Sequence, residues 1–70
     1  MPDRIKNNVY EKRTEHALTQ EELAVRVGVS RQTIIAIEKG NYTPSVLLAL
    51  KLAKVFTSPL ETVFRIVHEK

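Results

Sequence analysis

Two adjacent side chains near the middle of this chain, Arg31 and Gln32, carry paired hydrogen-bonding groups that lie in one plane. An arginine can bridge the O6 and N7 acceptors of guanine, and a glutamine can bridge N6 and N7 of adenine. Ala36, which is small, and Lys39, which is cationic, follow in the same segment. This set of residues is typical of a surface that contacts nucleic-acid bases and phosphates.

A helix over residues 31–39 would gather these four side chains on one side. Successive residues turn by ~100° around a helix, which places all four within about 140° of one another. Ile34 and Ile37 fall on the opposite side, where they can anchor the helix in a core. Ile35 falls on the outward side. It could touch thymine methyl groups, pack under the loop at Tyr42 or meet another subunit, and the two packing roles are favoured.

Polar groups on both sides of this segment could hold a phosphate backbone. Gln20 is expected at the start of a helix, where free N–H groups and the helix dipole favour an anion. Neutral donors nearby can bond to phosphates at the edge of a footprint. The candidate DNA-binding residues are therefore Gln20, Ser30, Arg31, Gln32, Thr33, Ala36, Lys39, Asn41 and Tyr42.

Plainer interpretations of these residues remain open. On composition alone, an Arg-Gln pair at a helix N-terminus is more often a solvated face than a base reader. Lys39 could contact a phosphate or only offset the negative end of its helix dipole. The excess of 11 Lys and Arg over 8 Asp and Glu, a net charge of +3, suits a nucleic-acid partner without requiring one.

Helix caps and apolar spacing predict five helices. Asn8 can cap a first helix that runs to about His16. A capping box at Thr19–Glu22 opens a second helix over Gln20–Val27, and Gly28 ends it in the left-handed conformation. With the helix that follows, this segment forms a helix-turn-helix at about residues 19–40.

The remaining helix boundaries follow the same chemistry. Ser30 can cap the third helix, over residues 31–39, and Gly40 can end it. Ser45 can cap a fourth helix to about residue 56. Residues 58–61, Ser-Pro-Leu-Glu, combine a cap, a proline at the first helical position and a glutamate at the third, which predicts a short fifth helix ending near residue 63.

The two chain ends are ambiguous. Residues 4–6, Arg-Ile-Lys, alternate polar and apolar side chains, and residues 65–68, Arg-Ile-Val-His, include two adjacent β-branched residues. Both segments could be short strands paired into a ribbon. Frayed termini are the alternative.

Length and composition argue against several classes of function. Residues 1–70 form one small domain, with no cysteine and with two histidines that cannot build a metal site alone. The sequence contains no catalytic arrangement such as Ser/His/Asp and no glycine-rich phosphate loop, so we do not expect an enzyme. Without a leader-like segment or an apolar run of ~18 residues, a cytoplasmic location is expected. We expect no cofactor, no metal, no membrane partner and no small-molecule effector.

The motifs resemble those of the phage-repressor (Cro-type, Xre-like) helix-turn-helix family. Residues 19–30 read Thr-Gln-x-x-Leu-Ala-x-x-x-Gly-Val-Ser, and residues 34–40 read Ile-x-x-Ile-Glu-x-Gly. Residues 42–45, 49–53 and 58–64 are similar to short stand-alone regulators of the cytolysin-repressor type. The resemblance spans about residues 9–64. It implies an all-α, five-helix, lambda-repressor-like DNA-binding domain, with a possible small two-stranded ribbon from the chain termini, and a dimer.

Carried over by position, the resemblance implies roles for five of the candidate residues. It places Gln20 on a phosphate, and it places Arg31 and Gln32 at base edges. It puts Ala36 and Lys39 on the surface that faces the groove. These assignments agree with the helix geometry described above.

The resemblance also implies a structural ion pair and points to two departures from the family. Arg13 and Glu38 occupy positions that form a partly buried ion pair in relatives. Ala17 stands where many relatives have glycine, so the turn after the first helix is expected to be extended or strained. Ile35 stands where relatives usually carry a polar side chain, which makes this part of the outer surface drier.

The fourth predicted helix has more apolar surface than one small core can cover. Residues 46–56 are apolar except for Lys51 and Lys54, and such a helix cannot leave a broad side in water. One side should cover the core, and residues of about 46–68 are expected to pack against a second subunit. A two-fold dimer would place two recognition helices ~34 Å apart and read an inverted repeat. A monomer that buries this surface internally is the alternative.

The sequence therefore predicts a transcriptional regulator that binds double-stranded DNA by sequence, with repression at an inverted-repeat operator by a homodimer as the favoured form. The alternative is an antitoxin or another protein-interaction module built on a helix-turn-helix. Such proteins usually need a segment beyond the core to wrap their partner. Here almost every residue is used by the predicted fold, which argues against the alternative.

Overall fold

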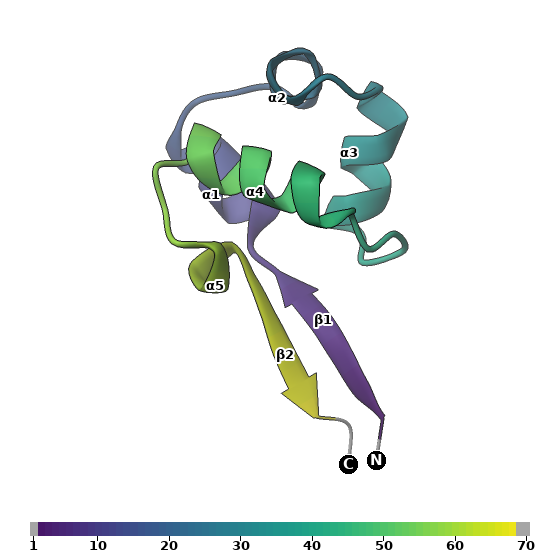
Figure 1. The fold of residues 1–70 in the computed structure, drawn as a ribbon. Coiled ribbons are helices and arrows are strands. Elements are labelled where there is room, and N and C mark those ends of the chain that lie inside the picture. Colours follow the sequence, from purple (N-terminus) through teal and green to yellow (C-terminus); the bar gives the residue numbers. More distant parts are fainter. Residues whose placement is uncertain (1, 69–70) are drawn as a thin grey trace.

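The computed structural model describes residues 2–68 and contains five helices and two strands. The helices gather at one end of the molecule, and the two strands run away from them side by side toward the chain ends (Figure 1). In chain order the elements are β1 (Asp3–Asn7), α1 (Val9–Glu15), α2 (Gln20–Val27), α3 (Arg31–Glu38), α4 (Val46–Val55), α5 (Leu60–Val63) and β2 (Phe64–His68).

The two chain ends form a real sheet, so the all-α class is corrected to a mostly helical fold with a two-stranded antiparallel ribbon. The register pairs Ile5 with Ile66, and the strands are five residues each. The N–H of Asn8 donates to the carbonyl of Val63 at 2.8 Å and closes the base of the ribbon. The β-branched residues of each end therefore lie in a strand that forms because the other end of the chain pairs with it.

The caps of the central helices match the predicted chemistry. The N–H of Glu22 donates to Thr19 Oγ1 at 3.0 Å, and Glu22 Oε1 accepts from the N–H of Thr19 at 2.8 Å, which completes the capping box. The bond from the backbone of Thr19 lowers the pKa of the Glu22 carboxyl below its usual value. Gly28 and Gly40 end their helices with φ of 76° and 80°.

Two predicted caps are wrong. The side chain of Asn8 makes no cap bond to α1 and donates instead to the carbonyl of Thr62 at 2.8 Å, while Asn7 Oδ1 accepts from the N–H of Val9 at 3.1 Å. The hydroxyl of Ser58 donates back to the carbonyl of Phe56 at 3.1 Å, and α5 begins after Pro59 without a side-chain cap. In both cases a carbonyl outside the helix competes for the side chain.

One hydrophobic core joins all five helices. Ile34 and Ile37 are fully buried and anchor α3, as the helical spacing predicts, and Phe56 closes the core after α4. The buried residues are Val9, Leu23, Ala24, Val27, Ile34, Ile37, Leu48, Leu52, Ala53, Phe56 and Val63. In the part of the chain that the structure describes, no helix has the length and apolar character needed to cross a membrane.

Among residues 2–68, two residues other than glycine adopt left-handed backbone conformations. Ala17, after α1, has φ of 54°, and Thr57, after α4, has φ of 48°. The strain expected at Ala17 is therefore present. At Thr57 the N–H of the next residue, Ser58, donates to the carbonyl of Ala53 at 3.0 Å, which is the bond of a helix-ending turn that usually holds glycine. A β-branched residue is poorly suited to this conformation.

Replacing Thr57 with glycine should raise the free energy of unfolding by about 0.5–1 kcal/mol. The left-handed conformation costs a residue with a side chain about 1–2 kcal/mol, and glycine removes this cost. Glycine also gives the unfolded chain more conformational freedom, which lowers stability by about 0.5–1 kcal/mol and so cancels part of the gain. Urea unfolding at one protein concentration measures the difference. The matched control is Thr62→Gly, inside α5, which should lower stability. A Thr57→Gly variant that is less stable than wild type would contradict the strain argument.

Candidate nucleic-acid interface

The outward side of α3 carries three exposed polar side chains, those of Arg31, Gln32 and Lys39. Among residues 2–68 the structure records no side-chain hydrogen bond or ion pair for any of them. Ala36, on the same side, is half-buried, and Ile35 is half-buried as well, so part of its apolar surface is already covered. The outer surface of α3 thus offers unengaged hydrogen-bonding groups on a helix whose opposite side is fixed in the core.

The start of α3 is held by its own side chains. The N–H of Thr33 donates to Ser30 Oγ at 3.2 Å, and the two hydroxyls lie 3.1 Å apart. Ser30 is exposed and Thr33 is half-buried. These two candidates therefore set where α3 begins, next to Arg31 and Gln32.

The end of α3 turns into an exposed loop. The N–H of Asn41 donates to the carbonyl of Ala36 at 2.9 Å, and the N–H of Gly40 donates to the carbonyl of Ile37 at 2.9 Å. Both Asn41 and Tyr42 have exposed side chains. They lie beyond Lys39, at the edge of the same outer surface.

Gln20 occupies the first turn of α2, as predicted, but its side chain is already engaged. Its Nε2 donates to Glu38 Oε1 at 3.0 Å, which joins the start of α2 to the end of α3. This contact between residues 18 positions apart was not predicted. The signal available in the sequence was the polar character of both residues, which is too general to identify a pair.

The predicted pair of Arg13 and Glu38 is present, and it is far better shielded than the other ion pair described, His68 with Asp3. Arg13 Nε lies 2.6 Å from Glu38 Oε2, and the side chains are 11% and 7% exposed. Arg13 Nη1 also donates to the carbonyl of Leu18 at 2.9 Å, and its guanidinium lies 5.3 Å from the centre of the Tyr10 ring. The hydrogen bond to Glu38 raises the pKa of the Arg13 guanidinium above its usual value. This pair ties α1 to the end of α3.

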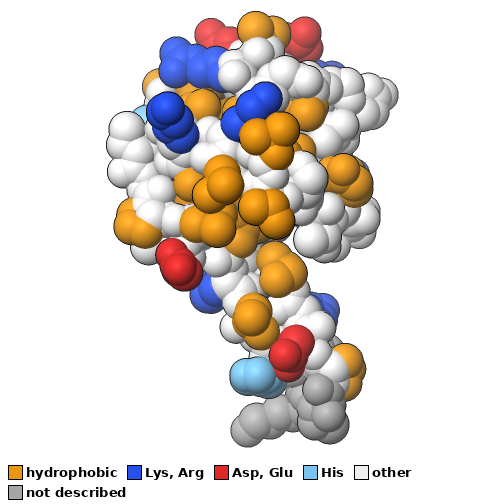
Figure 2. All heavy atoms as spheres, viewed as in Figure 1, with side chains coloured by type: hydrophobic (Ala, Val, Ile, Leu, Met, Phe, Trp, Pro, Cys, Tyr) orange, Lys and Arg blue, Asp and Glu red, His pale blue; other side chains and the backbone are white. Residues whose placement is uncertain are grey.

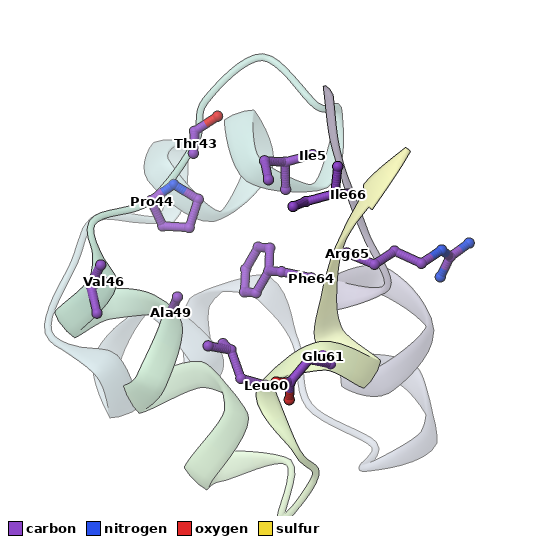
Figure 3. Close-up of a pocket in the computed structure, with 10 residues that line it drawn as sticks. All are labelled: Ile5, Thr43, Pro44, Val46, Ala49, Leu60, Glu61, Phe64, Arg65 and Ile66. Carbon is purple, nitrogen blue, oxygen red and sulfur yellow. The ribbon is translucent and has the colours of Figure 1, made fainter. Parts of the chain in front are cut away.

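A second surface, an apolar groove, lies beside α4. Its volume is about 400 Å³. Figure 3 shows Ile5, Phe64 and Ile66 pointing from the ribbon into the groove, opposite residues of α4 and α5. The lining residues are Ile5, Thr43, Pro44, Val46, Ala49, Leu60, Glu61, Phe64, Arg65 and Ile66.

The groove continues into exposed apolar surface on α4. Val46, Leu47 and Leu50 are 74%, 64% and 50% exposed. Figure 2 shows hydrophobic side chains gathered over this part of the molecule and continuing toward the ribbon. The fourth helix therefore does leave apolar surface uncovered within a single chain.

Sequence comparisons identify close relatives. The helix-turn-helix family matches residues 9–63. An HTH-type transcriptional regulator of Methanocaldococcus jannaschii is 57% identical over 60 residues, covering 86% of this chain and 91% of that protein. The regulator YgzD of Bacillus subtilis is 51% identical over 65 residues, covering 93% and 98%. The cryptic phage CTXphi transcriptional repressor RstR of Vibrio cholerae is 42% identical over 48 residues, covering 69% of this chain and 43% of the repressor.

Solved structures agree with this relationship. The restriction-modification controller protein C.AhdI of Aeromonas hydrophila has a TM-score of 0.71 and 31% identity, covering 77% of this chain and 82% of its own. The transcriptional regulator VanUg has a TM-score of 0.76 over 99% of this chain and 92% of its own, with 18% identity, and so supports the fold alone. Because the family match takes in all five helices and the relatives are named as regulators, this chain belongs to the Xre-like helix-turn-helix family of DNA-binding transcriptional regulators.

Proposed function

We propose that this protein is a repressor that binds an inverted-repeat DNA operator as a homodimer. The observation that carries the proposal is the outer surface of α3, where exposed Arg31 and Gln32 stand opposite two fully buried isoleucines. A helix held in this way can enter the major groove without losing its place in the core. The relationship to the repressor RstR supports repression as the form of regulation.

In the proposed complex, α3 reads bases and its surroundings hold the backbone. Arg31 and Gln32 contact base edges, because each can make two bonds to one base. Ala36 leaves room for close approach, and Lys39 faces a phosphate. The neutral groups of Ser30, Thr33, Asn41 and Tyr42, together with Gln20 at the start of α2, would contribute contacts to the backbone.

For Gln20, the bond to Glu38 defines a more specific role. Since one N–H of its Nε2 is donated to Glu38, its second side-chain N–H and the backbone N–H at the start of α2 are the donors left to meet a phosphate. Gln20 would then act by holding the start of α2 against the end of α3. The Arg13–Glu38 pair would support the same geometry from α1.

The proposed dimer forms through the apolar groove beside α4, with a second copy of this chain as its occupant. Val46 and Ile66 are 74% and 62% exposed in the single chain, although both border the groove. Burying apolar surface stabilises by about 25 cal/mol per Å², and a core of this size supplies only about 3–5 kcal/mol. A second copy therefore both covers the groove and adds the stability that a small domain lacks.

Replacing Gln32 with alanine should weaken binding to the selected operator by about 1–3 kcal/mol, since one bidentate base contact is lost. Stability should stay at the wild-type level, because the side chain is exposed and makes no recorded contact. Titration of labelled operator duplex measures the loss. A random duplex of the same length is the control, and its affinity should not change. Equal affinity of variant and wild type for the operator would refute the base-reading role.

Selection of bound sequences from random duplexes, followed by footprinting of the winner, tests the proposal as a whole. Two inverted half-sites about one DNA turn apart are expected. Enrichment of a single half-site would contradict the dimer. No enrichment, together with a protein partner that co-purifies at one-to-one ratio, would favour the protein-interaction module instead.

A further inference from the structure

Ile35 places a large apolar side chain on the outer surface of α3. It follows Arg31 by four positions and precedes Lys39 by four, and residues at this spacing lie one above the other on a helix. Ile35 therefore stands between the arginine proposed to read a base and the lysine proposed to meet a phosphate. Ile34 and Ile37, fully buried on the opposite side, fix this placement.

The core does not account for the Ile35 side chain. The residue is half-buried, but in the described part of the chain it belongs neither to the buried core nor to the partly buried apolar residues that pack against that core. Those partly buried residues are Leu18, Val29, Val55, Leu60 and Phe64. Part of the Ile35 side chain thus stays available at the outer surface of α3.

The proposed dimer interface does not account for Ile35 either. The apolar groove is lined by residues of the ribbon, the loop after α3, α4 and α5, and among residues 2–68 no residue of α3 lines it. A second copy seated in the groove would therefore leave Ile35 at the outer surface. Packing against the loop at Tyr42 would engage the covered part of the side chain and leave the remainder without a role.

We propose that Ile35 contacts the C5 methyl group of a thymine, next to the bases read by Arg31 and Gln32. The inference rests on the proposed function, because it needs α3 in the major groove. Among the four bases, thymine alone presents an apolar group there. Against any other base edge, Ile35 would cover polar groups without offering them a hydrogen bond, which costs free energy. Ile35 is thus a specificity-determining residue that selects thymine at one position of each half-site.

The test replaces each thymine of the selected operator in turn with deoxyuridine, which lacks only the C5 methyl group. At one position, wild type should bind about fourfold more weakly for each half-site replaced, which is the effect of one methyl group no longer buried. Ile35→Ala should bind the original and the replaced operator with equal affinity at this position. The comparison isolates the contact between side chain and methyl group, because a purely structural loss would weaken binding to both operators alike.

Two control variants sharpen the comparison. Val25→Ala shortens a β-branched side chain that is 74% exposed on α2, and it should keep the full wild-type loss on deoxyuridine. Ile35→Val retains a branched apolar side chain and should keep part of that loss. Thermal unfolding checks that each variant is folded. The deoxyuridine series on wild type needs no variant, so it tests the contact even if Ile35→Ala does not fold.

Two outcomes overturn the inference while leaving the proposed function intact. In the first, wild type binds its operator, but no thymine in it is sensitive to loss of the methyl group. Ile35 would then be a packing residue. In the second, a folded Ile35→Ala keeps the full wild-type loss, which would assign the methyl contact to another side chain. If wild type itself selects no sequence from random duplexes, the proposed function fails instead.

Discussion

Replacing Arg13 with methionine should lower the free energy of unfolding by about 3–5 kcal/mol, because Glu38 would be left as a shielded charge without a cation. The Glu38 side chain is only 7% exposed, and the amide of Gln20 would be its remaining partner. The substitution also removes the bond to the carbonyl of Leu18. A domain of this size has about 3–5 kcal/mol to lose, so much of the variant should be unfolded at room temperature.

Urea unfolding followed by circular dichroism measures this loss. Arg26→Met, on the exposed side of α2, is the matched control and should change stability by less than about 0.5 kcal/mol. Adding Glu38→Gln to Arg13→Met removes the unpaired charge and should recover part of the loss. The account is wrong if Arg13→Met and Arg26→Met are equally stable, or if the second substitution destabilises the first variant further.

Replacing Val46 with glutamate should convert the protein to a monomer and weaken binding to a two-half-site operator by about 10²–10⁴-fold. The charge would enter the centre of the proposed interface, since Val46 lines the apolar groove. When two DNA-binding domains are joined in a dimer, binding of the first raises the effective concentration of the second at its half-site, and this alone raises affinity by about 10²–10⁴-fold. At the first position of α4, a carboxylate is favourable to the helix dipole, so the single chain itself should not be weakened.

Val25→Glu is a closely matched control, because Val25 is also 74% exposed and lies on α2, away from the groove. Sedimentation equilibrium should show a dimer for the control and a monomer for Val46→Glu. Affinity for a single half-site should be the same for both variants if Val46→Glu remains folded, which circular dichroism verifies. If Val46→Glu sediments as a dimer, the interface lies elsewhere.

The helix boundaries were largely predictable from the sequence. The features that mark these boundaries depend on groups within a few positions of one another. They are the capping box of α2, the serine caps of α3 and α4, and the left-handed turns at Gly28 and Gly40. The isoleucines that anchor α3 follow from the helical period. Local hydrogen-bond chemistry and periodicity were therefore enough to place α3 and its outward residues.

The two caps that were wrong lost their side chain to another carbonyl: Asn8 bonds to one 54 positions away, and Ser58 to one only two positions away. The bond from Gln20 to Glu38 was not predicted either. The Arg13–Glu38 pair, which spans 25 positions, was reachable only through family resemblance. No spacing rule identifies partners at such distances, because the intervening chain decides whether they meet.

By itself, the sequence determined which helices form, where α3 begins and ends, and which of its side chains face outward, since these depend on contacts within one or two helical turns. Only the tertiary structure decided that the two ends pair as a ribbon, with Asp3 opposite His68. Those contacts require the five helices to bring the two ends of the chain together. Their physical origin is the shared core, which no single segment contains.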